Sequence, residues 1–387
     1  MIPPERGFPA AEFAQRTEHA QALMARSDLD ALLLTTEADV RYFTGYLTRF
    51  WESPTRPWFV IVPAFGKPVA VIPGIGAELM GKTWLEDIRT WRSPDLIDDG
   101  VSLLAAALLE LAGEKGRIGL PMGHETHLRM PLADYARLQR ELPRMTFGDA
   151  TAVLRKLQGV KSEREIAKIR YICGVASGVF ENIKGVVWPG KPLSAVFRDF
   201  QAALLHAGAD WVPYLAGGAG QGGYGDVISP AGDAPLRAGD VLMLDTGAVF
   251  DGYFCDFDRN WAIGRADDAA LRAYDLLYEA TEAGFAAAKP FATAADVCHA
   301  MNAVISRAGG AGEGGRLGHG LGMRLTEWPS LIPEDETVLE PGMVLTLEPG
   351  FEIAPGCIQV HEENIVVRNG GAEWLSRRAP AELPVIG

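Results

Sequence analysis

The stretch from Val241 to Asp258, VLMLDTGAVFDGYFCDFD, is the sequence feature that most constrains the fold. Its first apolar run ends on Asp245, and a second strand-like run begins after the pair Asp251-Gly252. An Asp-Gly pair between two such runs is a strong signal for a β-hairpin. One arm carries Asp245 and the other carries Asp256, so the hairpin can bring both carboxylates together. Because acidic side chains are rarely buried unless they are paired or bound to metal, this stretch predicts a cation site.

Three later fragments supply further ligand types. His319 stands in GHGLG, Glu348 ends an apolar run before Pro349-Gly350, and Glu363 lies in the strand-like IQVHEENIVV. Two Asp, two Glu and one His provide hard oxygen ligands and one nitrogen. Such a set suits two ions of Mn²⁺, Co²⁺, Fe²⁺ or Zn²⁺ rather than one.

These fragments resemble the pita-bread metallohydrolases, a family that includes methionine aminopeptidase, aminopeptidase P, prolidase and creatinase. The motifs DTG, GHGLG and LEPGMVLTLEPG carry the resemblance, together with five residues in the family's order: Asp245, Asp256, His319, Glu348 and Glu363. The resemblance covers the whole chain and is to the creatinase and prolidase branch. It implies an α+β fold, with a smaller creatinase-type α/β domain at 1–155 and a pita-bread catalytic domain at 156–387.

The resemblance also implies a role for each of the five residues. The residues that match Asp256 and Glu363 bridge two metal ions, and Asp245 matches a ligand that binds one ion with both oxygens. His319 and Glu348 match ligands of the other ion. Glu348 is also expected to move a proton, which makes it a predicted catalytic residue.

The choice between two adjacent glutamates rests on their neighbours. The family's ligand glutamate directly precedes Asp, Asn or His, and Asn364 follows Glu363, so Glu363 is preferred. Strand alternation then turns Glu362 to the opposite face and places His361 on the face of Glu363.

Two imidazoles that the family's peptidases use are absent. Thr326 stands seven residues after His319, where the peptidases carry a second His, and Ile228-Ser229-Pro230 occupies the region of another. His361 replaces an Arg found in aminopeptidase P and prolidase. We expect His361 to serve either as a substrate donor or general acid-base, or only to orient a ligand carboxylate. Thr326 is a predicted substrate contact.

The metal ligands favour an enzyme, and two classes of reaction stay open. The first is a dinuclear hydrolase that resembles Xaa-Pro peptidase or prolidase and acts on a small amide or dipeptide-like substrate. The second is a non-peptidase member of the fold, either a creatinase-like amidinohydrolase or a metal-dependent lyase. Because the imidazoles are missing, we expect a small polar or anionic substrate and poor turnover of Xaa-Pro peptides. A metal-free binding protein is disfavoured since the ligands are intact.

A loop rich in Arg and aromatic residues runs from Thr48 to Pro57. Arg49, Trp51 and Arg56 could hold a substrate carboxylate by bidentate hydrogen bonds beside an aromatic wall, although a plain surface loop is the simpler reading. In the creatinase branch an equivalent loop reaches the partner subunit's active site. The resemblance therefore implies a homodimer.

Composition narrows the possible partners and the location. The net charge of −14 disfavours nucleic acid and anionic membranes as partners. No apolar stretch is long enough to span a bilayer, and MIPPERGF lacks a signal-peptide pattern. The four Cys are widely spaced and form no CxxC motif, which indicates reduced thiols and predicts a cytoplasmic protein.

Overall fold

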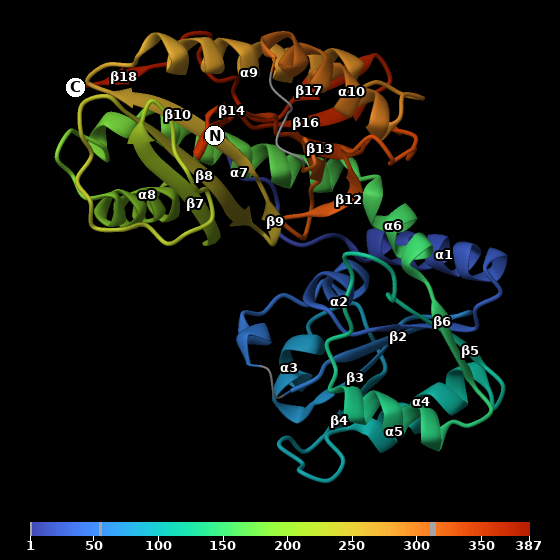
Figure 1. Ribbon diagram of the computed structural model, residues 1–387. Helices are drawn as coiled ribbons and strands as arrows, with labels where there is room; N and C mark the ends of the chain where they lie inside the picture. The colour runs from blue at the N-terminus through green and yellow to red at the C-terminus, as the bar shows by residue number, and fades with distance from the viewer. Residues whose placement is uncertain (1, 54–55, 310–314) are drawn as a thin grey trace. The chain divides into compact units, whose positions relative to one another are not determined.

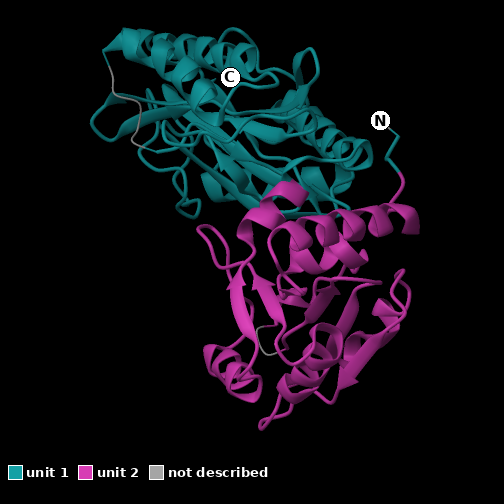
Figure 2. Ribbon diagram, turned by 90° about the vertical axis from the view of Figure 1, so that its right-hand side faces the viewer, with its two compact units in different colours: residues 1–4, 159–387 teal, residues 5–158 magenta. Residues whose placement is uncertain are grey.

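The computed structural model describes residues 2–53, 56–309 and 315–387, and the chain divides into two units. One unit comprises residues 5–158, and the other comprises residues 1–4 and 159–387 (Figure 2). Both contain helices and strands. In the described part of the chain, no helix is both long and apolar enough to cross a membrane.

The unit of residues 5–158 is built on one sheet of six strands in the order β4-β3-β2-β1-β5-β6. The strands are β1 (Ala31–Leu34), β2 (Phe59–Pro63), β3 (Val69–Pro73), β4 (Ile88–Trp91), β5 (Arg117–Leu120) and β6 (Thr146–Asp149). The helices are α1 (Ala10–Arg26), α2 (Glu37–Thr44), α3 (Ala77–Met80), α4 (Val101–Ala112), α5 (Leu132–Glu141) and α6 (Thr151–Gly159), with short 3₁₀ turns at η1 (Phe50–Glu52) and η2 (Gly74–Gly76).

The three central strands of this sheet are apolar and buried along their whole length. Strands β1, β2 and β3 carry side chains on both faces, so both faces need cover from helices. Figure 1 shows α1 and α2 on one side of the sheet and α4 and α5 on the other. On the second side, Leu33 and Phe59 belong to the same apolar core as Leu104 and Leu108 of α4.

The larger unit contains two five-stranded sheets and a two-stranded one. Their orders are β18-β10-β8-β7 with β9 beside β8, β12-β11-β13-β16-β17, and β14-β15. The strands are β7 (Trp211–Gln221), β8 (Asp240–Phe250), β9 (Tyr253–Phe254), β10 (Phe257–Ile263), β11 (His319–Gly320), β12 (Glu327–Ser330), β13 (Val344–Leu347), β14 (Gly350–Ala354), β15 (Cys357–Val360), β16 (Glu363–Arg368), β17 (Gly371–Trp374) and β18 (Val385–Ile386).

Helices cover these sheets. They are α7 (Glu163–Glu181), α8 (Leu193–Ala207), α9 (Asp268–Ala287) and α10 (Ala294–Ile305), with 3₁₀ turns at η3 (Ile183–Gly185) and η4 (Ser306–Ala308). Helix α7 packs on β8, α8 packs on β7, and α9 packs on β13, β14, β15 and β17. A capping box begins α7: Glu165 N–H donates to Ser162 Oγ at 3.3 Å, and Ser162 N–H donates to Glu165 Oε2 at 2.8 Å.

The predicted hairpin at the centre of the chain is present. Strand β8 pairs antiparallel with β9 and β10, and every residue of β8 is buried. The chain turns at Asp251 and Gly252, whose φ angles of 46° and 70° lie in the left-handed region that an Asp-Gly turn requires. The register places Asp258 of β10 directly opposite Asp245 of β8. Two acidic side chains therefore lie opposite each other in a buried ladder.

Candidate metal centre

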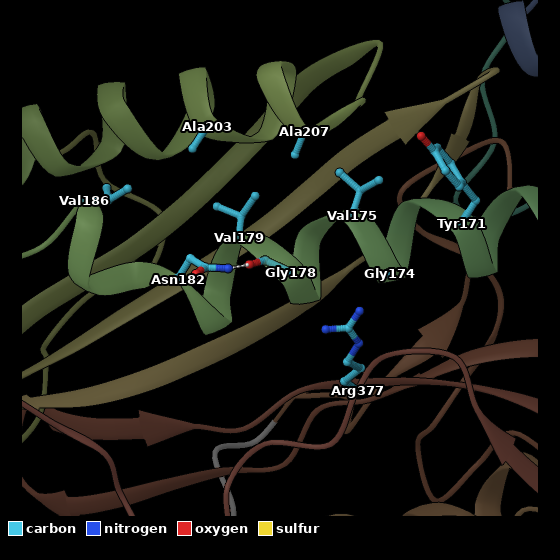
Figure 3. A pocket seen from close by; sticks show the side chains of 10 residues that line it. All are labelled: Tyr171, Gly174, Val175, Gly178, Val179, Asn182, Val186, Ala203, Ala207 and Arg377. Carbon is cyan, nitrogen blue, oxygen red and sulfur yellow. Dashed lines mark hydrogen bonds between the residues drawn. The ribbon is translucent and has the colours of Figure 1, made fainter. Parts of the chain in front are cut away.

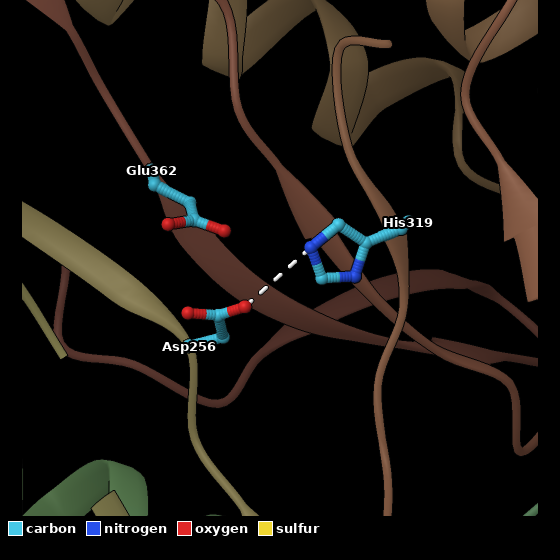
Figure 4. Close-up of side chains that lie close together, drawn as sticks. All are labelled: Asp256, His319 and Glu362. Carbon is cyan, nitrogen blue, oxygen red and sulfur yellow. Dashed lines mark ion pairs between the residues drawn. The ribbon is translucent and has the colours of Figure 1, made fainter. Parts of the chain in front are cut away.

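Three ligand-type side chains from distant parts of the sequence converge in the larger unit. Asp256, His319 and Glu362 are all buried, and one ligand atom from each lies within 4.8 Å of the other two (Figure 4). His319 Nε2 lies 3.4 Å from Asp256 Oδ2. Asp256 precedes β10, His319 begins β11, and Glu362 lies in the short break between β15 and β16. Three separate strand ends thus deliver one imidazole and two carboxylates to one place.

Two more predicted ligands, Asp245 and Glu348, belong to the same cluster. The Asp245 carboxyl lies beside Tyr214 and Glu362. Glu348 follows β13 directly, and its charge acts on both Asp256 and Glu362. The structure therefore brings four of the five predicted ligands together, with Glu362 in the fifth place.

The cluster contains carboxylate oxygens that protein atoms leave unsatisfied. Asp245 Oδ1, Asp256 Oδ1 and Glu362 Oε1 are buried and have no hydrogen-bond partner among the described residues. Buried polar atoms are normally paired, because an unpaired one loses its hydration without compensation. Three such oxygens beside an imidazole are the donors that divalent ions bind, so the residues fit a metal site.

The electrostatics of the cluster favour a bound cation. Burial, assisted by the neighbouring carboxylates, raises the pKa of Glu348 to about 8 and the pKa of Asp256 and Glu362 well above the ordinary range. Burial also raises the pKa of Asp245 to about 6. Without cations, Glu348, Asp256 and Glu362 therefore hold protons at neutral pH, so metal ions and protons compete for the same oxygens.

The His319 ring is oriented by its own backbone neighbour. Its Nδ1 lies 2.8 Å from the Gly320 carbonyl oxygen, and this contact makes Nδ1 the protonated nitrogen. Burial lowers the pKa of His319 to about 4, so the ring is neutral. The unprotonated Nε2 then faces Asp256, as a metal ligand would.

The predicted choice of Glu363 as a ligand is corrected by the structure. Its Oε2 accepts hydrogen bonds from Arg259 Nη2 at 3.0 Å and from the Ser376 hydroxyl. Its Oε1 accepts from Arg378 Nη1 at 3.0 Å and from Ala379 N at 2.8 Å. Both oxygens are therefore engaged with two guanidinium groups and cannot serve the cluster.

The physical reason lies in the break between β15 and β16. Alternation does separate Glu362 from Glu363, but the Glu362 N–H donates to Asp258 Oδ1 at 2.9 Å, which fixes Glu362 beside the acidic strand pair. The predicted metal-binding face, which carries Glu363, points away from the cluster, and the face that carries Glu362 points into it. The identity of the residue that follows a glutamate does not determine which face its side chain takes.

His361 lies on the same face as Glu363, and this removes it from the cluster. Its ring packs edge-on against Tyr274 at 5.1 Å between centroids, and its Nδ1 lies 3.2 Å from Thr281 Oγ1. Both partners belong to α9. The side chain is 1% exposed, and burial lowers its pKa well below the ordinary value. A neutral ring buried against α9 does not fit the predicted role of substrate donor or general acid-base.

The predicted substrate residues lie in several places. Thr326 is half-buried and directly precedes β12, while Ile228, in the region where the resemblance implies an absent imidazole, is 82% exposed. Arg49, Trp51 and Arg56 belong to the unit of residues 5–158, and residues 54 and 55 of their loop lie outside the described residues. A substrate role for these side chains stays a prediction.

The Arg49–Arg56 loop has an internal anchor. Arg129 donates to the carbonyl oxygens of Trp51 at 3.0 Å and of Arg56 at 3.1 Å. The Arg129 guanidinium also lies 5.1 Å from the centre of the Trp51 ring. This anchor holds the backbone of the loop and leaves the Arg49 side chain exposed.

Sequence reasoning missed two residues that contact the cluster. Asp258 is buried opposite Asp245, a position that follows from the hairpin register once the Asp-Gly turn is placed. Tyr214 of β7 lies beside Asp245, and burial together with the Asp245 charge raises the pKa of Tyr214. No local pattern marks Tyr214, because the pairing of β7 with β8 is a tertiary contact.

A cavity elsewhere in this unit differs from the acidic cluster in the residues that line it. A cavity of about 380 Å³ lies along α7 and α8, lined by Val175, Val179 and Ala203 among others, with Arg377 opposite α7 (Figure 3). Its lining is apolar apart from Tyr171, Asn182 and Arg377. It holds no carboxylate pair and no imidazole, so the acidic cluster is the candidate site.

Comparison with known proteins adds an independent line of argument. Residues 167–369 match the sequence profile of Metallopeptidase family M24, and residues 16–160 match that of the Creatinase/Prolidase N-terminal domain. A probable dipeptidase, PepE, of Mycobacterium tuberculosis is 29% identical over 385 residues, covering 98% of both chains. An ectoine hydrolase of Halomonas elongata is 26% identical over 403 residues, covering 97% of this chain and 98% of that protein.

Solved structures agree with these matches. Dipeptidase PepE from Mycobacterium ulcerans superposes with a TM-score of 0.85 at 27% identity, covering 98% of this chain and 99% of the other. An Xaa-Pro dipeptidase from Bacillus anthracis superposes with a TM-score of 0.84 at 23% identity, covering 97% and 100%, which shows the shared fold.

Proposed function

Because the chain belongs to Metallopeptidase family M24, we propose that it is a dinuclear metal-dependent hydrolase that cleaves an amide bond in a dipeptide or another small substrate. The two profile matches confirm the predicted family resemblance and the α+β fold class. The observation that carries the proposal is the convergence of Asp256, Glu362 and His319 beside Asp245, with one buried oxygen of each of the three carboxylates left unpaired by the described residues. We propose that the catalytic residues all lie within 156–387.

Five residues would hold the metal ions: Asp245, Asp256, His319, Glu348 and Glu362. Two divalent ions, drawn from Mn²⁺, Co²⁺, Fe²⁺ and Zn²⁺, would supply Lewis-acid activation of water and of the scissile carbonyl. Asp256 and Glu362 lie close together in Figure 4, and Glu362 would take the place among the metal-holding residues that the resemblance gave to Glu363.

The chain's own side chains would move the proton, orient the carboxylates and exclude water. Glu348 is the candidate for moving a proton between water and the leaving amine, since it stands at the end of β13 beside the other carboxylates. Tyr214 lies beside Asp245 and would orient its carboxyl group. Burial of the cluster excludes bulk water and strengthens each of these interactions.

The substrate is the open part of the proposal, and two observations favour a small molecule over an ordinary Xaa-Pro peptide. Thr326 stands where the peptidases carry one imidazole and Ile228-Ser229-Pro230 occupies the region of another, and removing one such donor costs about 10²–10³ in rate. One of the relatives is named an ectoine hydrolase rather than a peptidase. A small-molecule C–N hydrolase is therefore the second candidate function.

A substrate panel separates the two candidates. Protein loaded with Mn²⁺ should be assayed on Xaa-Pro dipeptides, other dipeptides, N-acyl amino acids, cyclic amidines and guanidino acids, with Asp256→Ala as the inactive control. Turnover of general dipeptides supports the dipeptidase assignment, and turnover of amidines alone supports the second candidate. If no C–N bond in the panel is cleaved, the hydrolase proposal fails and elimination becomes the reaction to test.

The remaining expectations are part of the same proposal. We propose manganese as a competent metal, a cytoplasmic location and a homodimer in which the Arg49–Arg56 loop completes the partner's pocket. The absence of CxxC motifs and the negative charge support the location, and the family resemblance supports the dimer.

A further inference from the structure

Asn364 holds the backbone on both sides of one candidate ligand. The Asp256 N–H donates to Asn364 Oδ1 at 2.9 Å, and Asn364 Nδ2 donates to the Asp256 carbonyl oxygen. The Asn364 side chain is fully buried, and the Cys173 thiol donates to the same Oδ1 at 3.3 Å. A single amide group thus satisfies both peptide groups of Asp256.

A matching set of hydrogen bonds holds the backbone of Glu362, the other candidate ligand. The Glu362 N–H donates to Asp258 Oδ1 at 2.9 Å, and Arg259 Nη1 donates to the Glu362 carbonyl oxygen at 3.1 Å. Asp258 is 1% exposed. Both peptide groups of Glu362 are therefore also satisfied by side chains.

The two arrangements are reciprocal. Asn364 follows Glu362 by two residues and holds Asp256, while Asp258 follows Asp256 by two residues and holds Glu362. Each ligand is thus anchored by a side chain from the strand that begins beside the other ligand. This reciprocity makes the separation of the two ligands depend on two buried polar side chains.

The position of the ligands explains why such anchors are needed. Asp256 precedes β10, which begins at Phe257, and Glu362 precedes β16, which begins at Glu363. Their peptide groups therefore lie outside the regular strand ladders, and buried backbone groups need partners. Side chains supply those partners, and they also fix the backbone positions from which the two carboxylate side chains project.

We propose that Asp258 and Asn364 are positioning residues that set the spacing of the Asp256 and Glu362 carboxylates, which would hold the metal ions. This inference rests on the dinuclear site proposed above. A preset spacing would keep two like-charged carboxylates at the separation that two ions need, so that the second ion binds without rearrangement of the strands.

Near-isosteric variants test the proposal. Asn364→Asp removes the donor to the Asp256 carbonyl oxygen and sets a carboxylate against it. Asp258→Leu removes the acceptor for Glu362 N–H, whereas Asp258→Asn retains an acceptor oxygen at the same place. Tyr42→Phe is the matched control: it deletes a buried hydrogen bond, from the Tyr42 hydroxyl to the Leu157 carbonyl oxygen at 2.9 Å, within the other unit.

Mn²⁺ titration calorimetry and electron paramagnetic resonance give a readout that a merely structural role would not change. We expect Asn364→Asp and Asp258→Leu to bind the second Mn²⁺ about 10–100-fold more weakly and to lose the spin-coupled signal of a Mn²⁺ pair. Asp258→Asn should stay within a few-fold of wild type. Tyr42→Phe should lower only the unfolding temperature.

The outcomes distinguish the positioning role of Asp258 and Asn364 from the proposal of a dinuclear site. If wild type binds two coupled ions and Asn364→Asp binds them equally well, the positioning role is overturned and the dinuclear site stands. If wild type shows no second ion and no coupled signal, the dinuclear proposal fails and the positioning role fails with it. Should Asp258→Leu not fold, the contrast between Asn364→Asp and Asp258→Asn carries the test.

Discussion

Glu362 and Glu363 are consecutive residues whose carboxylates lie in two different environments. Glu362 lies within the cluster with Asp256 and His319, and its Oε1 has no partner among the described residues. Glu363 lies between Arg259 and Arg378, each 3.0 Å away. Two guanidinium groups compensate the charge of Glu363, so this carboxylate is structural, whereas Glu362 needs a cation.

Substitution of these two glutamates should separate metal binding from stability. Glu362→Ala removes a proposed metal ligand, so the metal content should fall from two ions per chain toward one and activity should be lost. Glu363→Gln should retain both ions and instead destabilise the fold by about 3–5 kcal/mol, since it leaves the buried Arg259 guanidinium without its charged partner, while Arg378 keeps Glu282. Metal analysis and denaturant unfolding measure the two effects. Loss of metal from Glu363→Gln with full retention by Glu362→Ala would contradict the assignment.

The stability of the metal-free protein should fall as pH rises. A carboxyl group whose pKa is higher in the folded than in the unfolded chain stabilises the fold below its unfolded pKa, and that contribution is lost as pH rises through the folded pKa. Burial moves the pKa of Asp245 from 3.8 to about 6 and that of Glu348 from 4.5 to about 8. These two groups therefore contribute a loss of stability between about pH 4 and pH 8.

Bound metal should reverse this trend. Cations compensate the ionised carboxylates, so the gap in unfolding temperature between Mn²⁺-loaded and chelator-treated protein should widen as pH rises. Thermal unfolding at several pH values within that window measures the gap. A gap that narrows as pH rises would mean that these carboxylates do not bind the metal. Asp245→Asn, which cannot ionise at that position, should show a weaker pH dependence in the chelator-treated protein.

The local parts of the site could be predicted from sequence because they depend on neighbouring residues. The Asp251-Gly252 turn between two apolar runs defines the hairpin, and the hairpin fixes the arm on which Asp245 and Asp256 each lie. His319 and Glu348 stand out by their motifs. The same hairpin register pairs Asp258 with Asp245. Asp258 could have been found by extending the pairing to the residue two positions after Asp256.

The remaining parts depend on contacts between distant residues. Glu362 is directed into the cluster by Asp258, which is 104 residues away in sequence, and Glu363 is held by Arg259 at the same separation. Alternation determines that the two side chains diverge, but only these long-range contacts decide which one meets the metals. Because His361 lies on the same face as Glu363, it points toward α9 and away from the cluster.

Replacement of His361 should affect stability more than chemistry. The neutral ring is buried against Tyr274 and bonded to Thr281, so His361→Ala should destabilise the protein by about 1–3 kcal/mol through lost packing. Metal stoichiometry and the pH profile of kcat should stay as in wild type. A fall of kcat by about 10² or more, with metal content unchanged, would restore the role of general acid-base predicted for His361.

Restoring one imidazole should raise peptidase activity. Thr326 is half-buried directly before β12, on the chain that leads away from His319. If the missing imidazole limits turnover of Xaa-Pro dipeptides, Thr326→His should increase kcat/KM for them by about 10-fold or more, a part of the 10²–10³ that one such donor contributes. Thr326→Asn, of intermediate size, controls for altered packing. Equal Xaa-Pro activity in wild type and Thr326→His would show that Thr326 does not restrict the substrate.

The cationic loop should act in a dimer. Arg49 is exposed on a loop whose backbone Arg129 anchors through Trp51 and Arg56, so an Arg49→Ala, Arg56→Ala double variant should keep its fold and its metal. A loop that binds the substrate carboxylate would lose charge-assisted hydrogen bonds, so KM should rise by about 10-fold or more while kcat changes less. Arg129→Lys is the comparison variant, because it weakens the anchor and retains both loop arginines. Light scattering at micromolar concentration should give a dimer for all of these proteins; a monomeric wild type, or an unaltered KM in the double variant, would show that the loop does not complete a partner's site.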